Sequence, residues 1–218
     1  MSGNPYPNSP HVLKAALISM GGTIPVPRLI MLQYNPAELT RQLEPNFEKI
    51  GDTPTGTNLL AGPATETIQM TARISAVDQL QASDANAMMF GIYPQLATLE
   101  LMMFPTTSSV MLGLAQMALG VLEIVPPETP LTIFVWGPQR VLPVQITSYS
   151  VNETMHDTRL NPIDAEVTMS MKVLTYQDFE PTQTGFFLYL ASLAEREVMS
   201  ALGTVQSGAS IISGALGR

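Results

Sequence analysis

The sequence predicts an α+β fold: an antiparallel β-barrel or sandwich with inserted helices and a helix at its C-terminal end. Residues 131–174 carry three strand-like runs joined by short turns that contain Pro and Asn. Residues 67–75 and 165–173 alternate apolar and polar side chains, which is typical of strands with one buried face. Residues 78–125 change to helical spacing, and strands that bracket helices favour this fold class.

The first part of the chain is expected to form an arm followed by strands. Residues 1–10 hold three prolines and two asparagines, so residues 1–11 are expected to form an extended, mobile arm. Three strands follow, at residues 12–19, 27–34 and 39–47, of which the second is expected to be the more fully buried. Gly21 and Gly22 are expected to form the first turn. Residues 51–63, rich in Gly, Pro and Thr, predict a long loop.

Two helices are expected in the middle of the chain. Pro94 can open the first, in which Leu96, Leu99, Met102 and Met103 recur at helical spacing. Residues 110–122 are apolar and uncharged but shorter than the ~20 residues of a membrane-spanning helix. This second segment is therefore expected to be a buried helix, with a membrane-penetrating element as the alternative.

The last helix is expected at residues 183–205. Its apolar stripe consists of Phe187, Leu190, Ala194, Val198, Ala201 and Val205. A small-residue tail is expected after it, at residues 203–218. The domain organisation predicted from these elements is an arm at 1–11, one barrel domain at 12–180 with a helical insertion at about 94–125, and a C-terminal helix and Gly/Ser/Ala tail at 181–218.

Composition argues against several classes of function. Only 13% of residues are charged, against ~25% in an ordinary soluble protein, so some surface is expected to be buried against partners. The formal charge is −8, and the Lys and Arg residues are scattered, so neither nucleic-acid binding nor membrane insertion is expected. The chain has no cysteine, and its first residues lack a signal-peptide pattern, which favours assembly in the cytoplasm.

The sequence predicts no enzyme and no cofactor. Of the two histidines, His11 lies in the expected arm. His156 follows Glu153 in a segment expected to be an exposed turn, where regular strand spacing would point the two side chains to opposite faces. Together with Asp157, these two residues could in principle form a metal cluster or an acid–base site, but a solvated loop is expected instead. The glycines form no phosphate-binding motif, and the acidic residues at 78, 84 and 100 have no EF-hand or paired-carboxylate spacing.

The methionines and the single tryptophan have structural explanations. Six methionines lie between Met88 and Met117, where they are expected to fill a helical core, with a groove for a partner protein as the alternative. Trp136 is expected to anchor the core or the rim of the barrel.

Several short motifs occur in a fixed order along the chain. They are Tyr34-Asn35-Pro36, Gly62-Pro63 with Glu66-Thr67-Ile68, Pro94-Gln95-Leu96 with Leu99-Glu100, Phe134-Val135-Trp136-Gly137, Leu142-Pro143-Val144, and Leu160-Asn161-Pro162-Ile163-Asp164-Ala165. In this combination the chain resembles the tube-protein family of contractile injection systems, the phage-tail-like particles of bacteria. The similarity covers most of residues 13–179.

This resemblance implies a tail-tube type of β-barrel in a six-fold ring at the junction of the inner tube and the baseplate. The implied partners are other copies of the chain, the inner-tube protein, and the baseplate and spike or hub subunits, within a particle that is released or stays inside the cell. Several relatives continue into a LysM module, for which residues 181–218 are too short. The structural or interface candidates are Asn35, Pro36, Trp136, Gly137, Asn161 and Pro162.

Two other functions remain open at this point. The first is a baseplate wedge or tail-completion subunit, which would differ from a tube-initiating ring in stoichiometry and position. The second is a carbohydrate- or peptidoglycan-binding module, for which exposed aromatic side chains would be expected.

Overall fold

The computed structural model describes residues 13–20, 27–36, 38–47, 60–105, 107–120 and 130–216, with the backbone alone for residues 205–216. The strands are β1 (Ala16–Met20), β2 (Arg28–Met31), β3 (Leu39–Glu44), β4 (Thr65–Ser75), β5 (Leu131–Val135), β6 (Val141–His156) and β7 (Pro162–Val173). The helices are α1 (Val77–Gln81), α2 (Ala85–Phe90), α3 (Tyr93–Glu100), α4 (Thr107–Ala118) and α5 (Thr184–Leu216). The expected arm, the Gly21-Gly22 turn and residues 48–59, which include most of the expected loop, lie outside the described residues.

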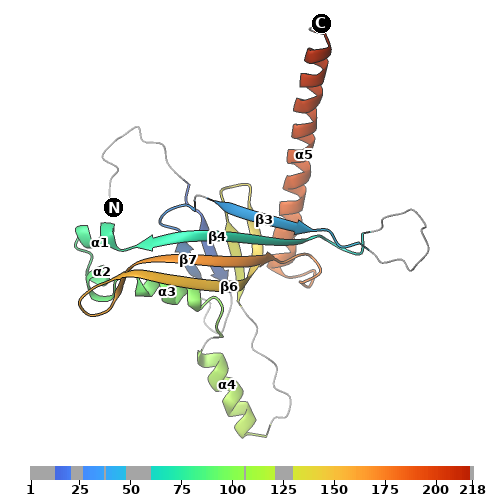
Figure 1. Ribbon diagram of the computed structural model, residues 1–218. Helices are drawn as coiled ribbons and strands as arrows, with labels where there is room; N and C mark the ends of the chain where they lie inside the picture. Colours follow the sequence, from blue (N-terminus) through green and yellow to red (C-terminus); the bar gives the residue numbers. More distant parts are fainter. Residues whose placement is uncertain are drawn as a thin grey trace.

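The strands form one antiparallel sheet in the order β2-β1-β5-β6-β7-β4-β3 (Figure 1). This arrangement, together with the helices, confirms the predicted mixture of an antiparallel sheet and helices. The expected closure into a barrel is not formed within the chain. The sheet ends at β2 and β3, and among the described residues no strand pairing joins these two ends.

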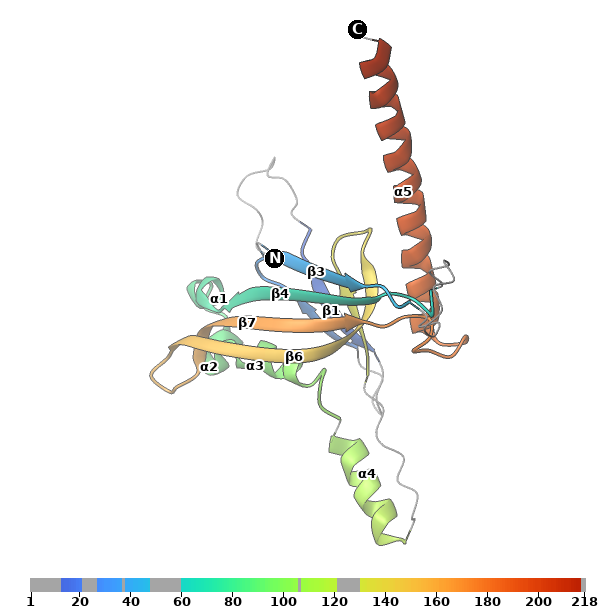
Figure 2. The ribbon, with the colours of Figure 1, turned by 45° about the vertical axis from the view of Figure 1, so that its right-hand side comes forward.

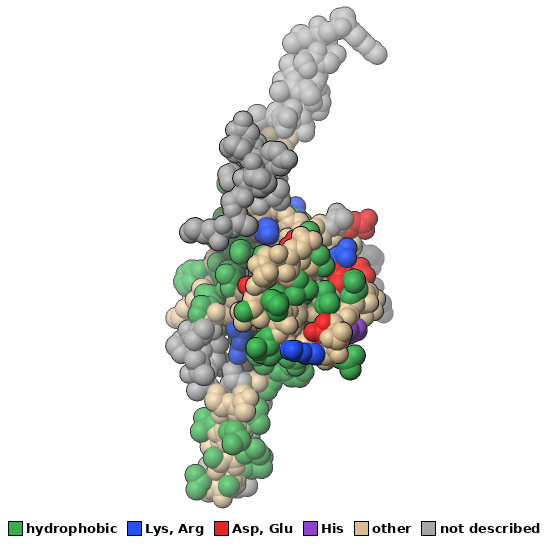
Figure 3. All heavy atoms as spheres, turned by 90° about the vertical axis from the view of Figure 1, so that its left-hand side faces the viewer, with side chains coloured by type: hydrophobic (Ala, Val, Ile, Leu, Met, Phe, Trp, Pro, Cys, Tyr) green, Lys and Arg blue, Asp and Glu red, His purple; other side chains and the backbone are tan. Residues whose placement is uncertain are grey.

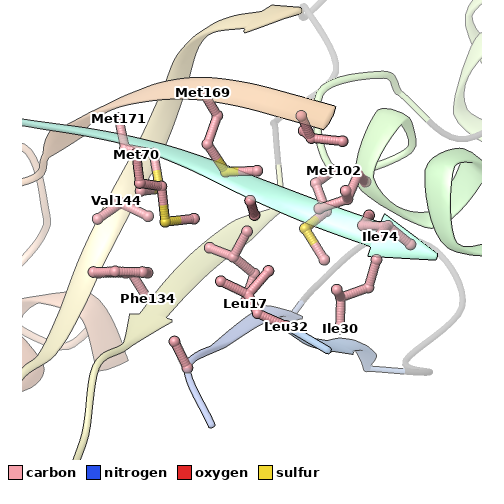
Figure 4. Packing of buried hydrophobic residues seen from close by; sticks show 14 of the residues in the cluster. Leu17, Ile30, Leu32, Met70, Ile74, Met102, Phe134, Val144, Met169 and Met171 are labelled. Carbon is pink, nitrogen blue, oxygen red and sulfur yellow. The ribbon is translucent and has the colours of Figure 1, made fainter. Parts of the chain in front are cut away.

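β6 divides the sheet into two halves that enclose the core. Its residues 141–144 pair with β5, and its residues 144–156 pair with β7, so the same strand passes from one half into the other. Leu17 and Phe134 of the first half point toward Met70 and Met169 of the second (Figure 4). The bend at β6 therefore allows an open sheet to bury its own apolar face.

The two strands with the clearest alternation in the sequence supply much of this core. Ala165, Val167, Met169, Met171 and Val173 of β7 are at most 1% exposed, and Ile68, Met70, Ala72 and Ile74 of β4 are also buried. Burying each large apolar side chain stabilises the fold by about 1.5–3 kcal/mol. The period-2 pattern predicted these strands and their buried faces correctly.

The second strand differs from its prediction. β2 covers four residues of the expected 27–34, and only Ile30 is buried within it, while Leu29 and Met31 are 55% and 64% exposed. The face of β2 that carries Ile30 lies on the core, whereas no described element covers the face that carries Leu29 and Met31. A run of apolar residues in the sequence does not reveal whether both faces are covered.

The helices between β4 and β5 begin at the end of the sheet. Asp84 caps α2 by accepting hydrogen bonds from the N–H groups of Asn86 and Ala87. Pro94 lies in the first turn of α3, and Leu96 and Leu99 are buried, as the helical spacing predicted. α3 packs near β2 and covers one side of the core.

Candidate functional site

Asn35 and Pro36 form the turn after β2. The Asn35 Nδ2 group donates to the carbonyl of Leu13 (2.7 Å), and its Oδ1 accepts from the N–H of Ala15 (3.0 Å). The N–H of Leu32 donates to the Ala15 carbonyl (2.8 Å). The amide side chain of Asn35 thus extends the pairing of β1 with β2 beyond the strands, and Pro36 is buried behind it.

Trp136 and Gly137 begin the turn between β5 and β6. Gly137 has φ +72°, a conformation that glycine adopts without steric cost, and the Trp136 N–H donates to the Arg140 carbonyl at 2.8 Å. The indole is partly buried, and its centroid lies 5.9 Å from that of Phe134. Trp136 is therefore located at the rim of the core.

The structure brings Asn35 and Trp136 together at one shallow hollow of about 360 Å³. The other residues that line it are Leu13, Ala15, Gly137, Gln139 and Arg140. Among the described residues, this lining contains no carboxylate, histidine or hydroxyl nucleophile.

Asn161 and Pro162 lie far from this hollow in the fold, at the turn between β6 and β7. Asn161 donates to both carboxylate oxygens of Asp157, from its side-chain Nδ2 and its backbone N–H, at 2.8 Å each. These hydrogen bonds hold the pKa of Asp157 below its usual range. Asn161 Nδ2 also reaches the Met89 carbonyl (3.2 Å), and the Pro162 carbonyl accepts from Ile92 (2.9 Å).

Gly91 explains how close the helices come to this turn. A Cβ atom at Gly91 would lie 2.0 Å from the Pro162 carbonyl oxygen, and the residue has φ +59°. Only glycine fits both conditions. Asn161 and Pro162 thus attach the α2–α3 segment to the sheet, and their role in the chain is structural.

Glu153 and His156 contact each other, contrary to the prediction that they point to opposite faces of an exposed turn. The residues belong to β6, and His156 Nε2 lies 3.1 Å from Glu153 Oε2. The register of β6 shifts between Glu153 and Met155 and again before His156, which breaks the regular alternation. Both side chains stay exposed, and the described residues contain no group of three potential metal ligands.

A buried ion cluster at Glu66 was not predicted from the sequence. The Glu66 side chain is 4% exposed, and its two oxygens accept from Arg41 Nε at 2.7 Å and from Arg196 Nη2 at 2.6 Å. The cluster joins β3, β4 and α5, elements that are far apart in the chain. Strand alternation could only indicate that Glu66 falls on the buried side of β4, together with Ile68.

A second carboxylate ties three strands together. Asp164 of β7 accepts from Arg73 Nε of β4 (3.0 Å) and from Thr154 Oγ1 of β6 (3.0 Å). The Arg73 hydrogen bond is the main reason that the pKa of Asp164 lies below its usual range.

The β3-β4-β7-β6 half of the sheet has two edges without a partner strand among the described residues. β3 pairs with β4 on one side only. Residues 145–156 of β6 pair with β7 on one side only, because the pairing of β6 with β5 ends at Val144. Each edge presents backbone N–H and C=O groups that can pair with another strand.

One face of this half-sheet is polar and uncovered. Its exposed side chains are Thr40, Gln42, Gln69, Thr71, Arg73, Ser148, Ser150, Asn152, Glu166 and Thr168. They line up across the strands: Thr71 lies opposite Thr168, whose partner on β6 is Ser150, and the hydroxyl oxygens of Thr71 and Thr168 are 3.2 Å apart. The face is rich in hydroxyl and amide groups and carries few charges.

α4 is not the buried helix that its apolar sequence predicted. No residue of α4 is buried, and Leu114, for example, is 55% exposed. The helix begins at Thr107 and projects away from the sheet (Figure 1). Hydrophobic side chains run along it (Figure 3). A helix that is apolar on most sides is normally covered, so α4 lacks a partner within the described part of its own chain.

α5 also presents an unexpected face. The apolar stripe predicted from the sequence is exposed, with Phe187 58% and Val198 57% accessible, while Tyr189 and Ser192 are buried instead. The α5 backbone is helical through Leu216, where a small-residue tail was expected. The stripe predicted as a core face is therefore an outer surface of the chain.

Two further findings concern membrane-spanning helices and similarity to known proteins. No helix in the described ranges has the length and hydropathy needed to cross a bilayer. A scan against models of protein families found no match, and a search of curated proteins found no relative.

Proposed function

We propose that this chain is a structural subunit of a contractile injection system. In this proposal it forms a six-fold ring layer that links the inner tube to the baseplate and spike and helps to initiate tube assembly. It would assemble in the cytoplasm with the inner-tube protein and other baseplate subunits. The observation that carries the proposal is the pair of free edges on the β3-β4-β7-β6 half-sheet.

The directions of these edges suit pairing between copies. Each neighbouring pair from β3 to β6 is antiparallel, so β3 and β6 run in opposite directions. When one copy is placed beside the next by rotation about a ring axis, its β3 meets the neighbour's β6 in antiparallel orientation. Such a head-to-tail contact repeats until the rotation closes. The tail-tube barrel absent from the single chain would then be formed by several chains.

The two faces of the half-sheet fit the same arrangement. The apolar face is already covered by β1, β2, β5 and α3, so the polar face is the one that would line a lumen. A lining of hydroxyl and amide groups would allow cargo or a spike component to move past without strong binding. The low proportion of charged residues also suits a chain with much of its surface in contacts.

The proposal is tested by placing lysines on one edge. Thr40 and Gln42 are exposed on β3, so Thr40→Lys with Gln42→Lys should leave the folded chain intact. Lysines at a sheet edge oppose pairing with another strand. Native mass spectrometry and cryo-EM are expected to show a ring for the natural chain and a 23.6 kDa monomer for the variant.

A matched control uses the same two residue types within the sheet: Gln69→Lys and Thr71→Lys lie on the same polar face of β4, a central strand. This control is expected to retain more of the ring than the β3 variant does. A natural chain that stays monomeric at high concentration and forms no ring in assembled particles would refute the proposal. A map that places the chain outside the tube axis would instead assign it to the baseplate wedge.

A further inference from the structure

We propose that α4 of one copy packs against the exposed stripe of α5 of the next copy, forming a second head-to-tail contact. We call the five residues Phe187, Leu190, Ala194, Val198 and Ala201 the outer stripe. This inference rests on the proposed ring, but it assigns a specific occupant to two surfaces that sheet pairing leaves uncovered.

The outer stripe lies on the side of α5 opposite its own sheet. The sheet-facing side carries Gly185, Tyr189, Ser192 and Arg196. At about 100° per residue, these positions and the outer stripe fall on opposite sides of the helix. No rotation of α5 that keeps the Glu66–Arg196 ion pair would bury the stripe against its own chain. Since none of the described residues covers the outer stripe, the proposal assigns its cover to another copy of the chain.

α4 has the chemistry to cover this stripe. Residues 105–122 contain no charged residue, and the exposed apolar side chains on α4 are Val110, Met111, Leu112, Leu114 and Met117. Methionine and leucine side chains are long and adaptable, so they fill irregular gaps. The charges of α5 are confined to residues 195–197, outside the stripe. Contact between the two helices therefore buries no unpaired charge.

The two surfaces also agree in shape and length. Ala194 has a small side chain and lies between the larger Leu190 and Val198 on the outer stripe, so a long side chain of α4 can pack into the space above it. α4 has 12 residues and is about 18 Å long, and the stripe from Phe187 to Val198 spans about 17 Å. α4 can therefore cover the outer stripe from Phe187 to Val198, which is the first part of the 33-residue α5.

The directions of the helices favour a contact between successive copies. α5 projects beyond the β3 side of the half-sheet, and α4 projects beyond the β6 side, in both ribbon views (Figures 1 and 2). In a ring joined through β3 and β6, the α5 of each copy extends toward the neighbour whose α4 extends back. A two-fold pairing of α5 with α5 would leave α4 uncovered, whereas the α4–α5 contact covers both.

The absence of cysteine from the sequence allows a direct test. The full-length Leu114→Cys chain is mixed with the full-length Val198→Cys chain and treated with a short bis-maleimide cross-linker. We expect the mixture to give a product of twice the 23.6 kDa chain mass, and each variant alone to remain at one chain mass. A chain with both substitutions is expected to give a ladder of higher masses.

Control positions lie on the other sides of the same helices. Gln116→Cys on α4 and Ser200→Cys on α5 are exposed but outside the proposed contact, and their mixture is expected to lose the cross-linked product. Circular dichroism of each variant verifies that the helices are retained. Because all four substituted side chains are exposed, folding should not limit the comparison.

Four results would overturn the inference. Cross-linking of Val198→Cys alone would assign the stripe to α5–α5 pairing. Flotation of the natural chain with phosphatidylcholine vesicles, lost in Leu114→Asp, would assign α4 to lipid. Rings seen by native mass spectrometry without any Leu114–Val198 product would reject the helix contact while leaving the proposed ring intact, whereas the absence of any oligomer would reject both.

Discussion

α3 and α4 are neighbouring helices that each carry two leucines, but only α3 is covered by the sheet. α3 has a single charged residue, Glu100, and α4 has none. α3 buries Leu96 and Leu99 against the sheet, and α4 buries none of its residues. The connection through residues 161–162 and Gly91 holds α3 at the end of the sheet, while α4 lies beyond it. Apolar sequence thus indicates that a helix needs cover, and the rest of the chain decides whether it provides that cover.

The largest predicted effect tests this contrast directly. Leu99→Ala is expected to lower the free energy of unfolding by about 2–5 kcal/mol, because it leaves a cavity in a close-packed core. Leu99 is fully buried, whereas Leu114 is mostly exposed, so Leu114→Ala should change stability by less than about 0.5 kcal/mol in the dilute monomer. Urea unfolding of both variants measures the difference. Equal losses would show that α4 is covered within its own chain.

The second prediction concerns α5, which the chain holds at one end only. Glu66→Gln is expected to cost about 1.5–3 kcal/mol, because it removes the charged partner of Arg41 and Arg196. Hydrogen exchange should rise in the first turns of α5 while β7 stays protected, which would make α5 resemble the uncovered α4. Glu197→Gln removes the same charge from an exposed position of α5 and should leave exchange unchanged. Uniform loosening of the sheet in Glu66→Gln would contradict a local role.

The smallest predicted effect is a loss of stability in acid. It arises from Asp164, at the end of the sheet that carries the α1–α3 segment. Asp164 has a folded-state pKa below its ordinary 3.8, so its ionised form stabilises the fold above about pH 4. This contribution is lost as the pH falls through the folded-state value. The urea midpoint of the natural chain should therefore drop below pH 4, and Asp164→Asn should be less stable at neutral pH and less sensitive to acid. Asp157 shifts in the same direction, so some acid sensitivity is expected to remain.

The sheet could be predicted well from the sequence because its signal is local. The alternation of apolar and polar residues along β4 and β7 identifies their buried side chains directly. Pro94 and the helical spacing of the leucines identify the buried side chains of α3. Gly137 at a positive φ and the Asn161-Pro162 turn also fall where the sequence placed turns. In each case, a few neighbouring residues determine the backbone conformation.

Apart from the helical conformation of residues 203–216, the errors concern relations between distant segments. The stripe of α5 was recognised, but the side facing the sheet is fixed by Arg196 and Glu66, which lie 130 positions apart. Burial of Leu29 depends on whether another element covers its face of β2, and the Glu153–His156 contact depends on bulges against β7. The hydrogen bond from the Asn35 side chain to the Leu13 carbonyl likewise joins residues that are distant in the sequence. Periodicity carries no information on these points.

The bulges in β6 bear on the number of copies in an assembled ring. Pairing of β3 with β6 between copies does not by itself fix the number of copies. The same two edges can produce a closed ring or an open spiral. The register of β6 shifts at residues 146–148 and 153–156, and such bulges bend a strand and increase its twist. In an assembly joined through β6, they would set the angle between successive subunits. The number of copies would then be encoded by a local irregularity of one strand, independently of how tightly the copies bind.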